Sequence, residues 1–257
     1  MNRMICNVAM VVSLCGSLGQ LYAGSVTYDL KNDWSTSQNP NGAWSYLSGS
    51  ALLPYVANVT GSSPFPIGTF PFGTPVSGWS DGYAGTWVKD PGGPYTIPVA
   101  HDALAGDIVA YNNDDGTGPA TSVRWTSDTA GVVNISGDVW AVNNLGRSHE
   151  WSLYENGTLL TKGDYFDGGV YSRSNPFEFS TGSGGASILQ NIVVSAGDEF
   201  TLSLTNPFGG PGDFSGVNFT VDLSASPVPE PTTFALLSLG AVGLAFGAYR
   251  RSARTAA

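Results

Sequence analysis

"VNFTVDL", residues 217–223, alternates apolar and polar side chains with a period of two. Successive side chains of a strand point to opposite faces, so this spacing gathers the apolar residues on one side. We therefore predict a strand with one buried face. The residues on that face are Val217, Phe219, Val221 and Leu223.

Three more segments alternate in the same way and predict strands. They are "VTYDL" at 26–30, "VVNISGDV" at 132–139 and "FTLSLT" at 200–205. Side chains of this period favour a half-buried sheet over a helix. The residues expected to face a core are Val26, Tyr28, Leu30, Val133, Ile135, Val139, Phe200, Leu202 and Leu204.

Turn residues connect the predicted strands. Asn156 and Gly157 both tolerate positive φ, so we expect a two-residue hairpin that pairs Glu155 with Thr158. "SAGDEF" around Gly197 predicts a second turn, leading from a strand at 192–194 into the strand at Phe200. A chain of such strands without covering helices must stack two sheets. We predict an antiparallel β-sandwich of jelly-roll type over residues 24–225.

The first third of this body is rich in proline and glycine. Residues 34–98 contain so many of both that long strands are not expected, and "PFPIGTFPFGTP" at 64–75 predicts a loop or an edge. No low-complexity linker sets this part off as a separate domain. We expect it to wrap one end of the sandwich.

The N-terminus has the pattern of a secretory signal peptide. Arg3 precedes an apolar run, and Ala23 precedes the expected cleavage site, so residues 1–23 are assigned to the signal. Both cysteines of the chain, Cys6 and Cys15, lie inside it. The mature protein would therefore contain no disulfide and no reactive thiol.

Charge limits the partners of the exported part. Between Gly24 and Pro231 all 20 acidic residues stand against six basic ones, a difference of −14. This balance excludes nucleic acid as an expected partner. It fits a soluble exported surface, with a cation-binding surface as the alternative.

The C-terminal end, "VPEPTTFALLSLGAVGLAFGAYRRSAR" at 228–254, combines three features. Thr232–Tyr249 is 18 residues long and uncharged, and as a helix it would measure about 27 Å, which is enough to span a bilayer. Arg250, Arg251 and Arg254 follow it and would stay on the cytoplasmic side, placing the body outside. Alternating prolines before the helix favour an extended strap.

This order of Pro-Glu-Pro, apolar helix and arginine cluster resembles the PEP-CTERM sorting signal, here at residues 226–254. The resemblance implies that an exosortase recognises Pro229, Glu230 and Pro231, with Arg250 and Arg251 as stop-transfer charges. It implies transient anchoring in the membrane, cleavage, and delivery to the cell surface or an extracellular matrix. Family members generally come from Gram-negative bacteria that make exopolysaccharide.

The body also resembles ectodomains found ahead of such tails. "NPNGAWSY" from Asn39 and "SVRWTSDTAGVVNISG" from Ser122 are similar to segments that recur there. Those ectodomains are β-sandwiches without an established activity. The chain departs from their pattern at "AHDALAGD" (100–107), where a His-Pro-Gly is common, so no role is assigned to His101.

Signatures of catalysis are missing from the sequence. His101 and His149 belong to no paired-histidine motif, which argues against a transition-metal site, and no serine lies in a GxSxG pattern. His149 alternates with Trp151 and is expected to be a strand residue. An acid pair of the glycosidase kind is neither visible nor excluded among so many carboxylates. We expect no catalysis and no required cofactor.

Two binding sites are suggested by composition. "NNDDGTG" from Asn112 and "DYFDGG" from Asp164 carry calcium-type ligands or simply turn residues, with Asp114 and Asp115 the better calcium candidates. All seven tryptophans lie in the exported body, and burial is the default for each. Trp79 and Trp87, with Tyr83, are the candidates for an exposed platform that stacks on sugars.

The sequence thus predicts an exported, non-catalytic protein of the cell surface or matrix, structural or glycan-binding. A secreted carbohydrate-active enzyme and a calcium-dependent adhesion module are the alternatives.

Overall fold

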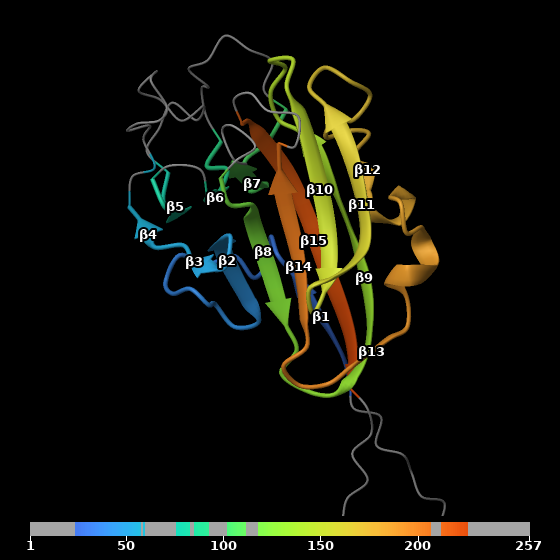
Figure 1. The fold of residues 1–257 in the computed structure, drawn as a ribbon. Coiled ribbons are helices and arrows are strands. Elements are labelled where there is room, and N and C mark those ends of the chain that lie inside the picture. Colours follow the sequence, from blue (N-terminus) through green and yellow to red (C-terminus); the bar gives the residue numbers. More distant parts are fainter. Residues whose placement is uncertain are drawn as a thin grey trace, which may run out of the picture. The chain divides into compact units, whose positions relative to one another are not determined.

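Alternating apolar and polar residues form strands along most of the described chain (Figure 1). The structure, a computed structural model, describes residues 24–57, 59, 76–82, 85–92, 102–111, 118–206 and 212–225. Its elements are β1 (Ser25–Asp29), β2 (Trp44–Ser48), β3 (Ala51–Leu52), β4 (Tyr55–Val56), β5 (Gly78–Ser80), β6 (Thr86–Lys89), β7 (Ile108–Tyr111), β8 (Thr121–Thr126), β9 (Gly131–Ala141), β10 (Ser148–Glu155), β11 (Thr158–Phe166), β12 (Phe177–Glu178), the 3₁₀ helices η1 (Phe179–Thr181) and η2 (Ala186–Leu189), β13 (Ile192–Val194), β14 (Glu199–Thr205) and β15 (Phe214–Ala225).

These strands pair into two antiparallel sheets. The nine-stranded sheet has the order β12-β9-β15-β7-β6-β5-β4, with β1 also paired to β15 and β13 to β9. The six-stranded sheet has the order β11-β10-β14-β8-β2-β3. One hydrophobic cluster contains side chains of both sheets, such as Trp125 of β8 and Phe219 of β15. The predicted antiparallel β-sandwich is therefore confirmed.

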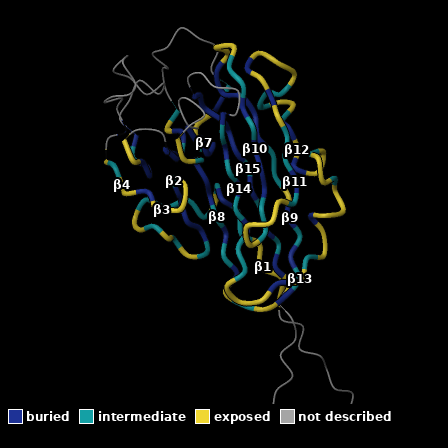
Figure 2. Tube along the Cα trace, viewed as in Figure 1, coloured by how far each residue is buried: buried dark blue, intermediate teal, exposed yellow. Residues whose placement is uncertain are grey.

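The longest pairing joins β9 and β15, whose register runs from Ser215 opposite Ala141 to Ala225 opposite Gly131. Both strands were predicted from their alternation. The residues expected to face the core on β9, β14 and β15 are all buried, which Figure 2 shows as dark blue stretches. In the predicted strand at 26–30 the pattern holds only in part, because Leu30, which directly follows β1, is buried whereas Val26 is 49% exposed.

Both predicted turns are present. Glu155 pairs with Thr158 across Asn156 and Gly157, which have φ values of 47° and 80°. These positive angles are what a two-residue hairpin of type I′ requires. The turn at Gly197 links β13 to β14, and since these strands belong to different sheets, it crosses from one layer of the sandwich to the other.

The proline- and glycine-rich first third forms only short strands, as predicted. It does more than wrap one end, however. β2 pairs with β8 and so extends the six-stranded sheet, while β6 pairs with β7 and extends the other. Edge strands tolerate prolines nearby because one side needs no hydrogen-bonded partner. The predicted loop at 64–75 lies outside the described residues.

Aromatic rings fill the space between the sheets. Trp44 of β2 meets Phe219 of β15 edge-on at 5.3 Å, and Phe219 also meets Phe179 at 5.9 Å. Trp125 and Trp151 are fully buried in the same cluster. Such offset and edge-on contacts add to the gain from burying each ring.

A smaller apolar cluster includes Trp140 of β9 and Phe214 of β15. Gly216 on the adjacent strand is required here, because a Cβ at this position would lie 2.0 Å from Cε2 of Trp140. The indole therefore packs directly against the glycine backbone. Its Nε1–H donates to the carbonyl oxygen of Asp102 at 2.6 Å.

The predicted signal peptide (1–23) and the sorting segment (226–254), with its expected membrane helix, lie outside the described residues. The described residues belong to one compact unit, Gly24–Ser226. Within them, neither 3₁₀ helix approaches the length or apolarity needed to cross a bilayer.

Candidate functional site

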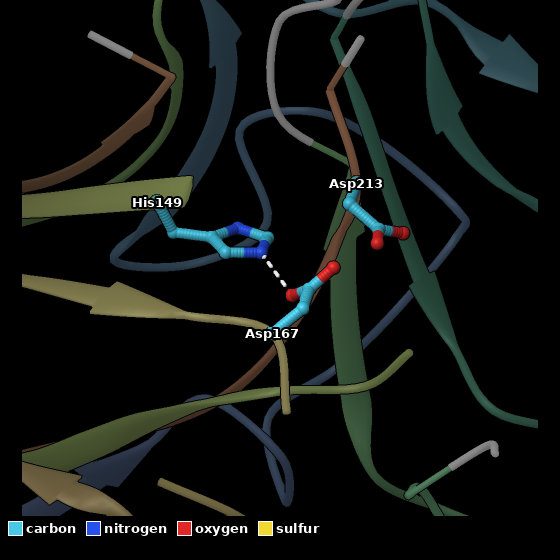
Figure 3. Close-up of side chains that lie close together, drawn as sticks. All are labelled: His149, Asp167 and Asp213. Carbon is cyan, nitrogen blue, oxygen red and sulfur yellow. Dashed lines mark hydrogen bonds and ion pairs between the residues drawn. The ribbon is translucent and has the colours of Figure 1, made fainter. Parts of the chain in front are cut away.

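A buried cluster of polar side chains lies at the end of the sandwich where β11 ends and β15 begins. His149 comes from β10, Asp167 directly follows β11, and Asp213 directly precedes β15. We call these three residues the polar cluster. Figure 3 shows them converging, with the carboxylate of Asp167 between the imidazole and the carboxylate of Asp213. All three are buried, and one ligand atom from each lies within 4.8 Å of the others.

Hydrogen bonds fix the imidazole of His149 on both sides. Its Nε2 lies 2.6 Å from Oδ1 of Asp167, and its Nδ1 lies 3.3 Å from Oγ of Ser215. Tyr165 donates its hydroxyl to the same Oγ at 2.5 Å and stacks its ring on the imidazole at 4.6 Å. The ring of His149 therefore has little freedom to rotate.

Backbone and amide donors hold the two carboxylates. Oδ2 of Asp167 accepts the backbone N–H groups of Leu145 and Arg147, both at 3.3 Å. Oδ1 of Asp213 accepts the backbone N–H of Phe214 at 2.7 Å and Nδ2–H of Asn143 at 2.8 Å. These bonds stabilise carboxylate oxygens that water does not reach.

The two carboxyl groups respond differently to burial. Burial acts to raise the pKa of Asp167, but the hydrogen bonds with His149, Asp213 and the backbone of Leu145, together with the charge of His149, outweigh it, and the pKa lies below its usual range. Burial raises the pKa of Asp213 strongly, and the adjacent charge of Asp167 raises it further. Two carboxylates this close do not both ionise easily. Burial therefore favours the protonated form of Asp213, whereas the hydrogen bonds of Asp167 favour its charged form.

Hydrogen bonds connect Ser215 to His149 and His149 to Asp167. The Ser-His-Asp triad of serine hydrolases has the same order of residues. The hydroxyl of Ser215 is 0% exposed, however, and Oγ already accepts the bond from Tyr165. A nucleophile must reach its substrate's carbonyl. In this conformation Ser215 is closed to any substrate.

Two surface hollows lie beside the polar cluster, each with a volume of about 320 Å³. They share Tyr171, whose half-buried ring stacks on Phe177 at 4.3 Å. The lining of the first hollow is Asp102, Ala141, Val142, Asn143, Asn144, Gly168, Gly169, Tyr171 and Ser172. The lining of the second hollow is Ser148, Asp164, Tyr165, Phe166, Gly169, Val170 and Tyr171.

Arg173 anchors the loop that carries Tyr171. Its backbone N–H donates to Oδ2 of Asp102 at 2.6 Å, and its guanidinium donates to both oxygens of Asp107 at 2.6 and 3.2 Å. Lys31 reaches the same carboxylate at 2.9 Å. Burial acts to raise the pKa of Asp107, but these bonds outweigh it and bring the pKa to about 2. The ion pairs thus hold the loop on the sandwich.

The predicted sugar platform at Trp79 and Trp87 is wrong, since the two side chains are only 3% and 0% exposed. They face each other across β5 and β6, and Trp79 packs in parallel on Tyr46 at 6.0 Å. Both rings lie in the hydrophobic core, although they come from short strands in a loop-rich segment. Removing their large apolar surface from water is favourable. Tyr83 lies outside the described residues.

The calcium candidates Asp114 and Asp115 lie outside the described residues, as do Pro229, Glu230, Pro231, Arg250 and Arg251. In the second motif, "DYFDGG", the carboxylates separate. Asp164 is exposed on β11, whereas Asp167 is buried against His149.

Sequence reasoning missed the polar cluster. Alternation with Trp151 correctly identified His149 as a strand residue, and the acid-rich "DYFDGG" contains Asp167. Nothing in the spacing links them to Asp213, because only the stacking of the two sheets brings the start of β15 beside β10 and β11. A contact between such distant segments has no local sequence motif.

Comparison with known proteins gives one family match. A model described as the PEP-CTERM protein-sorting motif matches residues 227–251. The curated proteins contain no match to the chain.

Two solved structures share a distant likeness. A GH26-CBM35 β-(1,4)-mannanase from Podospora anserina has 11% identity and a TM-score of 0.29, with 80% of this chain and 29% of that chain covered. A β-glucosidase from Paenibacillus barengoltzii has 15% identity and a TM-score of 0.23, with 43% and 10% covered. The chain thus spans less than a third of either length. TM-scores this low do not indicate a shared fold.

Proposed function

We propose that this chain, which carries a PEP-CTERM protein-sorting motif, acts outside the cell by binding polysaccharide without catalysing a reaction. The motif marks it as an exported protein that an exosortase sorts to the cell surface. The proposal for the body rests on one observation: Tyr171 lines two hollows that also carry polar side chains.

The sorting step is assigned to the end of the chain. We infer that exosortase reads Pro229, Glu230 and Pro231, while the apolar segment at 232–249 anchors the precursor and Arg250 with Arg251 stops its transfer. Glu230 is the charged residue of the Pro-Glu-Pro motif, so its substitution tests this assignment directly.

Membrane fractionation of cells tests this assignment. Glu230→Ala is expected to leave uncut precursor in the inner membrane, whereas Glu178→Ala, an exposed acid of the body, is processed normally. Normal processing of the Glu230 variant would contradict recognition through this acid.

Polysaccharide binding is supported by the chemistry of the hollows. Sugars present apolar ring faces and a rim of hydroxyls, so their sites combine an aromatic ring with amide and carboxylate groups. Tyr171 supplies the ring, and Asp102, Asn143, Asn144 and Ser172 supply polar groups on one side. Two hollows that share one aromatic residue suit a polymer better than a single sugar.

The arrangement of acids favours binding over hydrolysis. Glycosidases of the common kinds need two carboxyl groups on either side of the bond that is cut. Among the described residues, the first hollow has Asp102 alone and the second has Asp164 alone. Asp102 is also engaged, because it accepts the backbone N–H of Arg173.

Pull-down of the full-length chain with insoluble polysaccharides and a glycan array test the proposal. We expect Tyr171→Ala to weaken binding at least ~10-fold, the loss of about 1.4 kcal/mol that a stacking contact supplies. Tyr55→Ala is the matched control, since Tyr55 is 49% exposed and lines neither hollow. Equal binding by both variants would refute this site. Release of reducing sugar ends, abolished by Asp102→Asn or Asp164→Asn, would establish an enzyme instead.

A further inference from the structure

We propose that His149, Asp167 and Asp213 bind one divalent transition-metal ion, with Asn143 completing the site. The inference does not depend on polysaccharide binding, and it departs from the expectation drawn from sequence motifs. It assigns the polar cluster a ligand of the zinc or manganese class.

The donor atoms have the chemistry and spacing that such an ion requires. One imidazole nitrogen and two carboxylate oxygens are a common ligand set for zinc, at metal–ligand distances of about 2.0–2.2 Å. These three atoms already lie within 4.8 Å of one another. The contact of 2.6 Å between His149 Nε2 and Asp167 Oδ1 would open to about 3.3 Å, the edge of a tetrahedron around zinc.

The second nitrogen of His149 is held as metal ligands usually are. Ser215 Oγ lies 3.3 Å from Nδ1 and accepts from Tyr165, so it is placed to accept Nδ1–H as well. That tautomer leaves the lone pair of Nε2 directed at the acids. An oriented outer hydrogen bond of this kind is typical of histidine ligands.

Asn143 supplies the independent observation. Its side chain is 4% exposed, and its Nδ2–H bonds to Asp213. The oxygen of the same amide, Oδ1, is buried and has no hydrogen-bond partner among the described residues. A buried carbonyl oxygen without a partner is costly. A metal ion, or a water bound to it, would satisfy Oδ1.

Charge also favours a cation at this place. Arg147 donates Nη1–H to the backbone carbonyl of Gly212, next to Asp213. Two buried acids lie beside one imidazole, and a divalent ion would balance the charge of both carboxylates. The imidazole ligand favours zinc or manganese over calcium, which prefers an all-oxygen shell.

Asn143 connects the polar cluster to the surface. It bonds to Asp213 and also lines the first hollow, which is open to solvent. An ion could therefore exchange through this hollow without separation of the two sheets.

The test measures metal content and melting of the purified full-length chain after chelator treatment and reloading. We expect about one zinc per chain and a rise in Tm of about 5 °C at zinc concentrations ~100-fold above Kd. Calcium at the same concentration is expected to raise Tm by less than about 1 °C. Cobalt(II) should give the visible absorption of a buried tetrahedral site.

Asp213→Asn is the decisive variant. Asparagine has the shape of the carboxyl and keeps an oxygen for Phe214 and Asn143, so the variant should fold. We expect it to bind zinc at least ~100-fold more weakly. His149→Gln should behave in the same way, and Asp128→Asn, an exposed acid in the turn between β8 and β9, should bind normally. Undiminished zinc binding by a folded Asp213→Asn protein would overturn the proposal, as would binding lost on Asp128→Asn alone.

Discussion

The middle of the sandwich and its β11–β15 end are both buried, but by different chemistry. Between the sheets, rings such as Trp44, Trp151 and Phe219 exclude water through apolar contact. At the end, His149 and two acids are equally buried and depend on directed hydrogen bonds. The apolar region tolerates a change of shape poorly, whereas the polar region tolerates a change of charge poorly. Stability and binding are thus assigned to separate parts of one core.

The largest effect is expected in the apolar region. Phe219→Ala removes a ring that is 1% exposed and contacts both Trp44 and Phe179. We expect the free energy of unfolding to fall by about 4 kcal/mol, measured by urea denaturation. Val193→Ala, at a side chain 77% exposed, should change it by less than about 0.5 kcal/mol. Similar losses in both variants would contradict a core centred on these rings.

A second variant adds volume to the buried apolar region instead of removing it. Gly216→Ala would place a Cβ 2.0 Å from the Trp140 ring, so strand and indole must separate. We expect a loss of about 3 kcal/mol, with quenched or shifted tryptophan fluorescence. Ser224→Ala, at an exposed position of the same strand, should be neutral within about 0.5 kcal/mol. A Gly216 variant as stable as the parent would show that the strand and the Trp140 indole can separate at little cost in free energy.

The ion pairs beside the hollows are expected to contribute less. Asp107→Asn removes a buried charge that accepts from Arg173, Lys31 and the backbone of Leu104. We expect a loss of about 2 kcal/mol at pH 7, since both cations are partly exposed.

The contribution of Asp107 to stability is expected to depend on pH. The folded pKa of Asp107 is about 2, below its unfolded value, so its contribution is present above pH ~4 and is lost as the pH falls toward 2. The Asp107 variant and the parent should therefore converge in Tm below pH ~3. A constant difference across this range would contradict the ion pairs.

The smallest effect concerns Asp138 on β9. Its pKa is raised to about 6, because burial and the charge of Glu178 together outweigh the hydrogen bond from Asn218. The folded protein then binds more protons than the unfolded chain between pH 4 and 6, so this group lowers stability as pH rises through that window.

Asp138→Asn removes this dependence and keeps an acceptor for Asn218. We expect the variant to be more stable than the parent by about 1 kcal/mol at pH 7, after discounting for partial exposure. The two proteins should match near pH 4 in thermal unfolding. A variant less stable at pH 7 would show that the charged carboxylate is favourable.

Local pattern was sufficient for much of the fold. Alternation identified β9, β14 and β15 with their buried faces, and Asn156 with Gly157 predicted the hairpin register. It failed for Trp79 and Trp87, because the short strands there carry no period from which a face can be assigned. Burial of a large ring in such a segment depends on which sheet it joins.

The sequence by itself determined the layered class of the fold and the sorting signal, because strand periodicity and the order Pro-Glu-Pro, apolar run, arginines are local properties of the chain. Only the tertiary structure brought His149 and Asp167 together with Asp213, and set the hollows around Tyr171. Those contacts join strands of two different sheets. Their distances follow from pairing and stacking, which no segment specifies alone.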